Sequence, residues 1–133
     1  MKGDRLVPVL DDVDTAPFFD AARRHELVVQ VCNGCGALLH LPRAYCAECG
    51  SWDSRWQVTS GRGRVYSWTV VEHQVHPSMP VPYTIVLVEL DDYPAARFVG
   101  KIAGAVDLTA GQVVHAEFEE LEPGIVLPRW VLA

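Results

Sequence analysis

The sequence predicts a mainly β protein with a single short helix near the N-terminus, and three observations support this prediction. Short runs rich in β-branched and aromatic residues recur after Cys49, separated by clusters of glycine and proline. Four cysteines form two closely spaced pairs just before these runs. Half of the 133 residues are hydrophobic and 21% are charged, so the chain can bury a core. We therefore expect a metal-binding module followed by a small antiparallel barrel.

The first predicted element is a helix over residues 15–26. A capping Asp or Thr precedes Pro17, whose missing N–H costs little in the first helical turn. Phe18 and His25 are seven residues apart and fall on one helical face, together with two alanines between them.

The four cysteines are the strongest functional signal in the sequence. They follow the pattern C-x2-C, ten residues, C-x2-C, and a glycine follows the second cysteine of each pair. Two cysteines three positions apart can bind one metal ion only if the backbone turns tightly, and glycine accepts the positive φ that such a turn often needs. Two such turns supply four thiolates in tetrahedral geometry, so we interpret the segment as a zinc ribbon. The predicted ligands are Cys32, Cys35, Cys46 and Cys49.

Three other uses of these cysteines are less well supported. Disulfides need an oxidising compartment, for which the chain shows no export signal. Iron in a rubredoxin-like site is an alternative metal, and a redox site would leave the matching spacing of the second pair unexplained. A zinc ion held by four thiolates has no open position for water or substrate, so we expect its role to be structural. No thiol then remains for covalent acyl chemistry.

The rest of the chain predicts short strands. One strand leads into the first cysteine pair, another leads out of it, and six more follow. In the segment 112–119, Val114, Ala116 and Phe118 alternate with polar residues, which is typical of a strand with one buried face. Five or six short strands after a zinc ribbon favour an OB-type barrel. The predicted strands are residues 27–31, 37–41, 55–59, 63–72, 83–90, 97–102, 112–119 and 125–132.

These elements predict three parts. An extended segment and the helix occupy residues 1–26, the zinc ribbon occupies residues 27–55, and the OB-fold occupies residues 56–133. No flexible linker separates the ribbon from the barrel, so we expect the two to pack as one body.

The charge balance disfavours some classes of function. Eleven basic and seventeen acidic residues give a net charge of −6, whereas non-specific nucleic-acid binding needs an excess of Lys and Arg. Residues 56–133 carry five basic and nine acidic side chains, so a single-stranded nucleic-acid-binding OB module is a less favoured alternative. No apolar stretch is long enough to span a membrane, and the N-terminus lacks a signal-peptide core. We expect a cytoplasmic protein without a nucleic-acid or membrane partner.

Several motifs together resemble a known family. They are Pro17-Phe18-Phe19, the run from Leu27 to Cys32, Leu41-Pro42-Arg43, Ser60-Gly61-Arg62-Gly63, the run from Val65 to Val71, and Leu127-Pro128-Arg129-Trp130. From residue 15 to residue 133 the chain resembles proteins that combine an N-terminal helical segment, a rubredoxin-like zinc ribbon and a C-terminal OB-fold. That family was first catalogued as a domain of unknown function.

The resemblance implies a non-catalytic, acyl-CoA-binding accessory subunit of a thiolase-superfamily enzyme. Members of the family serve thiolases of archaeal isoprenoid precursor synthesis, and thiolase-like aldolases that shorten steroid side chains in actinobacterial cholesterol catabolism. Nine of the eleven basic residues are arginines, which fits the actinobacterial branch. The resemblance therefore favours a lyase complex for retro-aldol cleavage of a steroid side-chain CoA thioester. A thiolase or hydroxymethylglutaryl-CoA synthase complex is the alternative.

The implied partner is a thiolase-fold subunit that carries the catalytic groups. Such partners are usually two-fold symmetric, so we expect a heterotetramer of two plus two chains. Some relatives are fused behind a hot-dog hydratase domain, so the chain can also be part of a longer protein or associate with such a hydratase. A third hypothesis is a hydrolase or aldolase that works alone with His73 or His76, the two histidines that lie close together in a proline-rich loop. No nucleophile elbow, phosphate-binding glycine loop or convincing acidic pair accompanies them.

CoA binding requires a few arginines for the phosphates and an apolar slot for the pantetheine arm. Arg62 and Arg64 alternate at the entrance to a barrel strand and should share one face. Arg43 lies between the cysteine pairs. The CoA contacts that we expect are Arg43, Tyr45, Arg62, Arg64 and Trp68, with Tyr83 and Phe98 as further ring faces.

Overall fold

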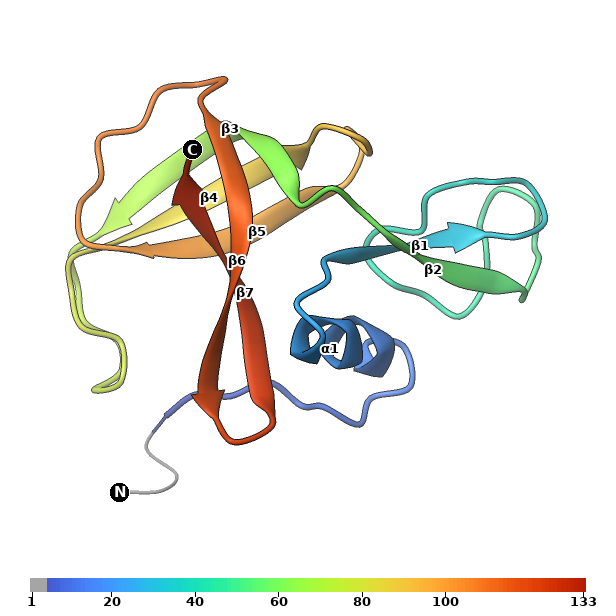
Figure 1. Ribbon diagram of the computed structural model, residues 1–133, viewed down its shortest axis with the longest axis horizontal. Coiled ribbons are helices and arrows are strands. Elements are labelled where there is room, and N and C mark those ends of the chain that lie inside the picture. Colours follow the sequence, from blue (N-terminus) through green and yellow to red (C-terminus); the bar gives the residue numbers. More distant parts are fainter. Residues whose placement is uncertain (1–4) are drawn as a thin grey trace.

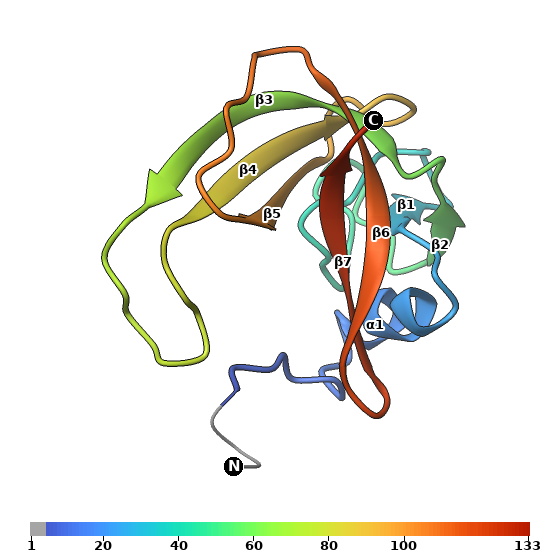
Figure 2. The ribbon, with the colours of Figure 1, turned by 60° about the vertical axis from the view of Figure 1, so that its left-hand side comes forward.

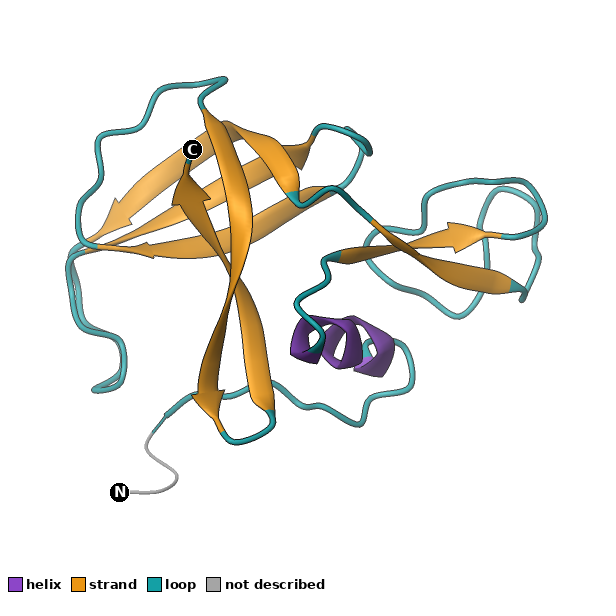
Figure 3. Cartoon of the chain, in the orientation of Figure 1, coloured by secondary structure: helices purple, strands orange, loops and turns teal. Residues whose placement is uncertain are grey.

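The computed structural model describes residues 5–133, which contain one helix and seven strands (Figure 1). The first four residues of the expected extended segment lie outside the described range. Strands dominate the chain, as Figure 3 shows, and they form a two-stranded and a five-stranded sheet. No helix among the described residues is long and apolar enough to cross a bilayer. The elements are α1 (Ala16–Arg23), β1 (Val28–Cys32), β2 (Ser54–Val58), β3 (Arg62–Val71), β4 (Tyr83–Leu90), β5 (Arg97–Ala103), β6 (Val113–Glu122) and β7 (Ile125–Leu132).

The helix α1 ends three residues before the predicted boundary. His25 has a φ of 59°, in the left-handed region, and therefore cannot continue the helix. Its N–H donates to the carbonyl of Ala22 at 2.9 Å, and the N–H of Glu26 donates to the carbonyl of Ala21 at 3.0 Å. These two bonds form a Schellman motif, which satisfies carbonyls that the last helical turn leaves without partners.

The ribbon is built on the antiparallel pair of β1 and β2. Their register runs from Val28 opposite Val58 to Cys32 opposite Ser54, so the first metal ligand lies at the end of a short sheet. All five residues of β1 are buried. The expected boundary between residues 55 and 56 falls inside β2, since this strand belongs to the ribbon sheet.

The strand predicted over residues 37–41 was wrong. Only a single bridge forms, between Val31 and Leu38, and the N–H of Leu39 donates to the carbonyl of Gln30 at 2.8 Å. Pro42 follows shortly afterwards and has no N–H to continue a ladder. The return from the first cysteine pair is therefore a loop held against β1.

The barrel strands lie in the order β5-β4-β3-β6-β7, and every neighbouring pair is antiparallel. Figure 2 shows β3 and β4 curving around the barrel, with the β6–β7 hairpin facing them. The edge strands β5 and β7 meet where Trp130 covers Gly100. A Cβ at position 100 would overlap the indole ring and lie 2.9 Å from its Nε1. The observed bounds of β3 to β7 agree with the predicted strands to within three residues.

One core joins the ribbon to the barrel. Leu27, Val29 and Val31 come from the ribbon side, and they belong to the same buried cluster as Val86 and Val114 of the barrel. The helix α1 contacts β7 and β1 and so lies between the two parts (Figure 1). The ribbon and the barrel therefore pack as one body, as the absence of a linker predicted.

Candidate metal centre and binding groove

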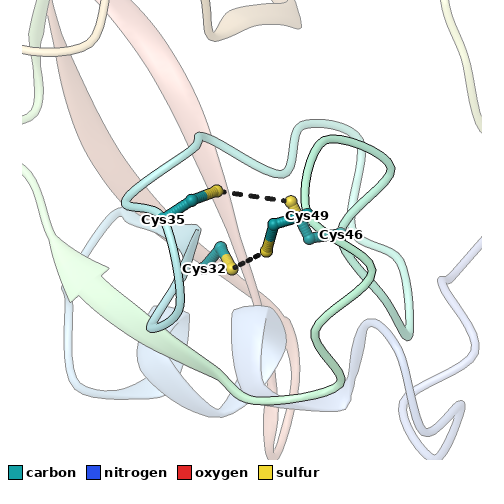
Figure 4. Close-up of side chains that lie close together, drawn as sticks. All are labelled: Cys32, Cys35, Cys46 and Cys49. Carbon is teal, nitrogen blue, oxygen red and sulfur yellow. Dashed lines mark hydrogen bonds between the residues drawn. The ribbon is translucent and has the colours of Figure 1, made fainter.

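The four predicted ligands converge on one point. The sulfurs of all four cysteines lie within 4.8 Å of one another, and no other cluster of potential metal ligands occurs among residues 5–133. The Sγ atoms of Cys32 and Cys49 are 3.6 Å apart, and those of Cys35 and Cys46 are 3.7 Å apart (Figure 4). Disulfide bonds are excluded at these distances, because bonded sulfurs lie about 2.05 Å apart.

The two cysteine pairs sit in nearly identical turns. The N–H of Gly36 donates to the carbonyl of Cys32 at 3.0 Å, and the N–H of Gly50 donates to the carbonyl of Cys46 at 2.8 Å. These glycines have φ values of 76° and 77°. A side chain at either position would be strained in this left-handed conformation, so the glycine after each pair is a requirement of the turn.

The sulfur spacing fits zinc. An ion about 2.3 Å from each of four tetrahedral sulfurs holds them about 3.8 Å apart, close to the 3.6 Å between Cys32 and Cys49 and the 3.7 Å between Cys35 and Cys46. Cys32 and Cys46 are buried, whereas Cys35 and Cys49 lie at the surface. Four protein ligands complete the coordination shell, so the metal centre is a structural zinc site.

The pKa values of three thiols depart from the ordinary value of 9.0. The backbone N–H of Cys35 lowers the pKa of Cys32 to about 7. The backbone N–H of Ala37 acts in the same direction on Cys35, but the Cys46 sulfur opposes it, and the pKa of Cys35 rises to about 12. The backbone N–H of Ser51 lowers the pKa of Cys49, but the Cys32 sulfur, burial and the Cys46 sulfur together outweigh it, so this pKa is also raised. Zinc binds thiolates, so it must displace protons from this cluster.

Gln30 fixes the loop between the cysteine pairs. Its amide nitrogen donates to the carbonyl of Arg43 and to the Ser54 hydroxyl, both at 2.9 Å. Its amide oxygen accepts from the N–H of Arg43, also at 2.9 Å. A buried side chain of β1 therefore replaces the strand pairing that this loop lacks.

The predicted CoA contacts on the ribbon lie at its surface. Arg43 is exposed, although its backbone is held by Gln30. Tyr45 is half exposed, and its ring centroid lies 5.5 Å from that of Trp52, at an interplanar angle of 34°. The two rings touch each other, so they leave no slot for a base between them.

The predicted contacts on the barrel lie along β3. Arg62 and Arg64 are on its exposed face, as expected from the alternation with buried Gly63. Arg64 forms an ion pair with Asp91 at 3.7 Å. Trp68 follows a bulge in β3, pairs with Val86 of β4 and is partly exposed. The structure does not bring these residues and the ribbon contacts into one pocket.

The two histidines of the proline-rich loop do not form a metal site. His76 is engaged locally, because its Nδ1 lies 2.7 Å from the Ser78 hydroxyl. His73 is exposed. Neither belongs to a cluster of metal-ligating side chains among the described residues.

An apolar groove of about 320 Å³ lies where the helix, the ribbon and the barrel meet. Phe18 and Phe98 stack on each other in its lining, with ring centroids 6.0 Å apart and planes inclined by 18°. Leu41 of the ribbon loop and Val99 of β5 also line it and are 73% and 72% exposed. Phe19 and Trp56 complete the aromatic lining.

Three of the four polar side chains that line this groove have partners within the chain, and Thr15 is the fourth. Gln30 is occupied by Arg43 and Ser54, and Nε2 of His40 lies 2.9 Å from the carbonyl oxygen of Arg97. The Arg97 guanidinium lies 3.9 Å from the centroid of the Tyr66 ring and forms an ion pair with Glu89 at 3.4 Å. The groove therefore presents carbon atoms and little free polarity.

Only part of the groove could be predicted from the sequence. Phe98 was expected as a further ring face for CoA, but Leu41, Trp56 and Val99 were not expected to contact a ligand. They come from three separate elements, and no local pattern marks residues that meet only after folding. None of the five predicted CoA contacts lines the groove.

A closed four-cysteine centre beside an OB-type barrel defines the class: a zinc-ribbon and OB-fold protein whose metal supports structure. Comparisons with known proteins agree with this class. Residues 19–53 match the model for "ChsH2, rubredoxin-like zinc ribbon domain", and residues 56–119 match the model for "ChsH2, C-terminal OB-fold domain". The chain belongs to the ChsH2 family, also called DUF35.

Two solved structures are similar to this chain. The Ltp2-ChsH2(DUF35) aldolase matches with a TM-score of 0.83 and 34% identity, covering 92% of this chain and 97% of that one. A DUF35 protein of unknown function from Sulfolobus solfataricus matches with a TM-score of 0.62 and 15% identity, covering 91% of this chain and 86% of that one. The second likeness shows the fold alone.

Two curated relatives are named as hydratase subunits. The probable enoyl-CoA hydratase alpha subunit of Thermomonospora curvata is 36% identical over 86% of this chain. The 3-oxo-4,17-pregnadiene-20-carboxyl-CoA hydratase alpha subunit of Mycobacterium tuberculosis is 34% identical over 90% of this chain. In each case the match covers 36% of the relative, so the chain spans about a third of the length of these proteins.

Proposed function

We propose that this chain is a non-catalytic accessory subunit of a thiolase-like aldolase, and that the complex cleaves a steroid side-chain CoA thioester by a retro-aldol reaction. In such a step the β-hydroxyl of the acyl group loses its proton and the Cα–Cβ bond breaks. The β-carbon becomes a ketone, and the α-carbon takes up a proton to leave a shortened acyl-CoA. The partner subunit supplies the acid and base groups.

The match to the ChsH2 chain of an aldolase carries this proposal. It covers 97% of that chain at 34% identity, so the similarity extends over both the ribbon and the barrel. The name of the mycobacterial relative includes a steroid CoA thioester, which suggests the class of substrate. Both observations favour a role in steroid acyl-CoA metabolism.

The side chains of the described residues support an accessory role. All four thiols belong to the metal centre, so none can form a thioester with substrate. A general base needs a partner or substrate proton within hydrogen-bond reach. In the proline-rich loop that holds His73 and His76 (the histidine loop), His76 contacts only the neighbouring Ser78 hydroxyl. The ion pair of His115 with Glu117 is exposed.

CoA binding belongs to the same proposal. Arg62 and Arg64 lie on the exposed face of β3, where a partner could add the rest of a phosphate site. Arg43, Tyr45 and Trp68 lie on other surfaces, so we propose that they contact CoA only together with the partner. A two-fold symmetric partner would then bind two copies of this chain.

A second candidate is a role within a hydratase. Both curated relatives are named hydratase alpha subunits, and each is matched over only about a third of its length. In that case the chain would belong to, or associate with, a hot-dog hydratase domain. The same fold would then link hydration of the acyl-CoA to its cleavage.

Co-expression distinguishes these candidates. The chain is produced with the Ltp2-type aldolase subunit of the same organism in one culture, and with the hydratase subunits in another. Size-exclusion chromatography with light scattering then measures the mass of each complex. A stable assembly of two plus two chains with the aldolase subunit supports the proposal. Assembly with the hydratase subunits alone would support the second candidate and contradict the first.

A further inference from the structure

We infer that the groove between helix, ribbon and barrel binds the apolar ring system of the acyl group and leaves the thioester to the partner subunit. This inference rests on the proposed function, because the ring system is that of a steroid thioester. It assigns this chain a direct part in substrate recognition. The five CoA contacts predicted from the sequence lie outside this groove.

The size and lining of the groove suit a flat, apolar small molecule. Its volume of about 320 Å³ is at the small end of the range of about 300–1,000 Å³ that is typical of small-molecule sites. Such sites are concave, mostly apolar and common between structural units. Four aromatic rings line this one, from α1 (Phe18 and Phe19), β2 (Trp56) and β5 (Phe98). Flat, rigid walls suit a flat, rigid ring system.

The groove carries too little positive charge to be a site for the CoA phosphates. Arg97 is its only charged lining residue, and the guanidinium is already held by the Tyr66 ring and by Glu89. Gln30 and His40 are also hydrogen bonded within the chain. A single arginine that is already paired with a carboxylate is a poor match for the several phosphates of CoA, so the occupant is the apolar end of the thioester rather than its CoA end.

The rim of the groove is open to the surface. Leu41 and Val99 are more than two-thirds exposed, so the groove opens to the surface and a ligand can extend out of it. A ring system bound inside would present its side chain and thioester outside this chain. Binding energy from a remote, non-reacting part of a substrate can then position the reacting part in the partner's site.

Titration of the isolated chain with 3-oxo-4-pregnene-20-carboxylate tests the inference, with backbone amide NMR shifts and calorimetry as readouts. The key variant is Val99→Trp, which fills the groove from an exposed position of β5, where an aromatic residue is well tolerated. The control is Val75→Trp, which adds the same side chain at an exposed position of the histidine loop, outside the groove lining. Thermal unfolding and zinc content are measured for every variant, so that any loss of fold is detected.

We expect saturable binding, with shifts at Phe18, Phe98 and their neighbours. Val99→Trp should weaken it by about tenfold or more, since the bulky ring takes the ligand's place, and Val75→Trp should not. Absence of binding to the wild-type chain, or equal affinity of the two variants, would overturn the inference. Octanoate is the comparison ligand: if it binds as tightly as the steroid acid, the assignment to a ring system is wrong. An active complex with the aldolase subunit would leave the proposed function intact in either case.

Discussion

Gln30 shows how a single buried side chain can position a loop that has no regular structure. It is 7% exposed, and its amide makes three hydrogen bonds that hold Arg43 and Ser54. Nothing in the sequence marks this residue, because its partners are thirteen and twenty-four positions away. The clustering of the four cysteines, in contrast, could be predicted, since their spacing alone encodes the turns that bring them together.

Substitution of one metal ligand tests the structural role of zinc. Cys32→Ser should lose both zinc and soluble expression, because the binding energy of a structural zinc is part of the folding energy, on the order of 10 kcal/mol. Metal content by mass spectrometry and thermal unfolding measure the two effects. Ala47→Ser is the matched control, as it changes an exposed residue within the second cysteine turn. Zinc-free protein that folds like wild type would contradict the structural role.

The thiol pKa values predict how zinc binding depends on pH. Because the pKa of Cys32 is lowered to about 7, this cysteine is mostly a thiolate above neutral pH. It becomes protonated, and so a poorer zinc ligand, as the pH falls below that value. Cys35 and Cys49 have raised pKa values, so zinc must displace their protons at pH 7. Zinc affinity should therefore rise with pH, and acidification should release the metal.

A zinc indicator dye measures this release between about pH 8 and about pH 5. We expect zinc to be retained at the upper end and lost progressively below neutrality. Circular dichroism of the same samples should change together with the metal. Zinc release that does not vary over this range would contradict the competition between protons and metal.

At the scale of elements, the agreement between sequence and structure depends on how local each signal is. The barrel strands were predicted to within three residues, because turns and β-branched runs mark them. The helix end and the strand at residues 37–41 were wrong, and both places also make tertiary contacts. His25 stacks on Phe118 of β6, with ring centroids 5.3 Å apart, and His40 contacts the backbone of β5.

The closure of the barrel gives a prediction at this scale. Gly100→Ala should destabilise the protein by about 1–3 kcal/mol, because the new methyl group would overlap the Trp130 indole. Chemical denaturation measures the change in the free energy of unfolding. Ala103→Val enlarges an exposed residue of the same strand and should have little effect. Equal stability of Gly100→Ala and wild type would show that β5 and β7 do not pack closely.

At the scale of the whole molecule, the groove could not be predicted from the sequence. It requires α1, the ribbon loop and β5 to meet, and their order along the chain says nothing about the space between them. The net charge, in contrast, is a property of the sequence alone and could be used without knowledge of the fold. The net charge of −6 still disfavours nucleic acid as the partner of this barrel.

The ribbon and the barrel share one core, and all four thiols lie in the metal centre. These properties describe one rigid body, which fits the proposed accessory role. In the proposed function, recognition lies in this chain and bond cleavage in the partner.

Turnover of a 17-hydroxysteroid 20-carboxyl-CoA thioester tests this division most directly. Steroid ketone formation is measured with the zinc-loaded chain alone, the aldolase subunit alone, and the two together. We predict no product from the chain alone and sustained cleavage only from the pair. Sustained cleavage by the isolated chain, lost on substitution of His73 or His76, would contradict the account.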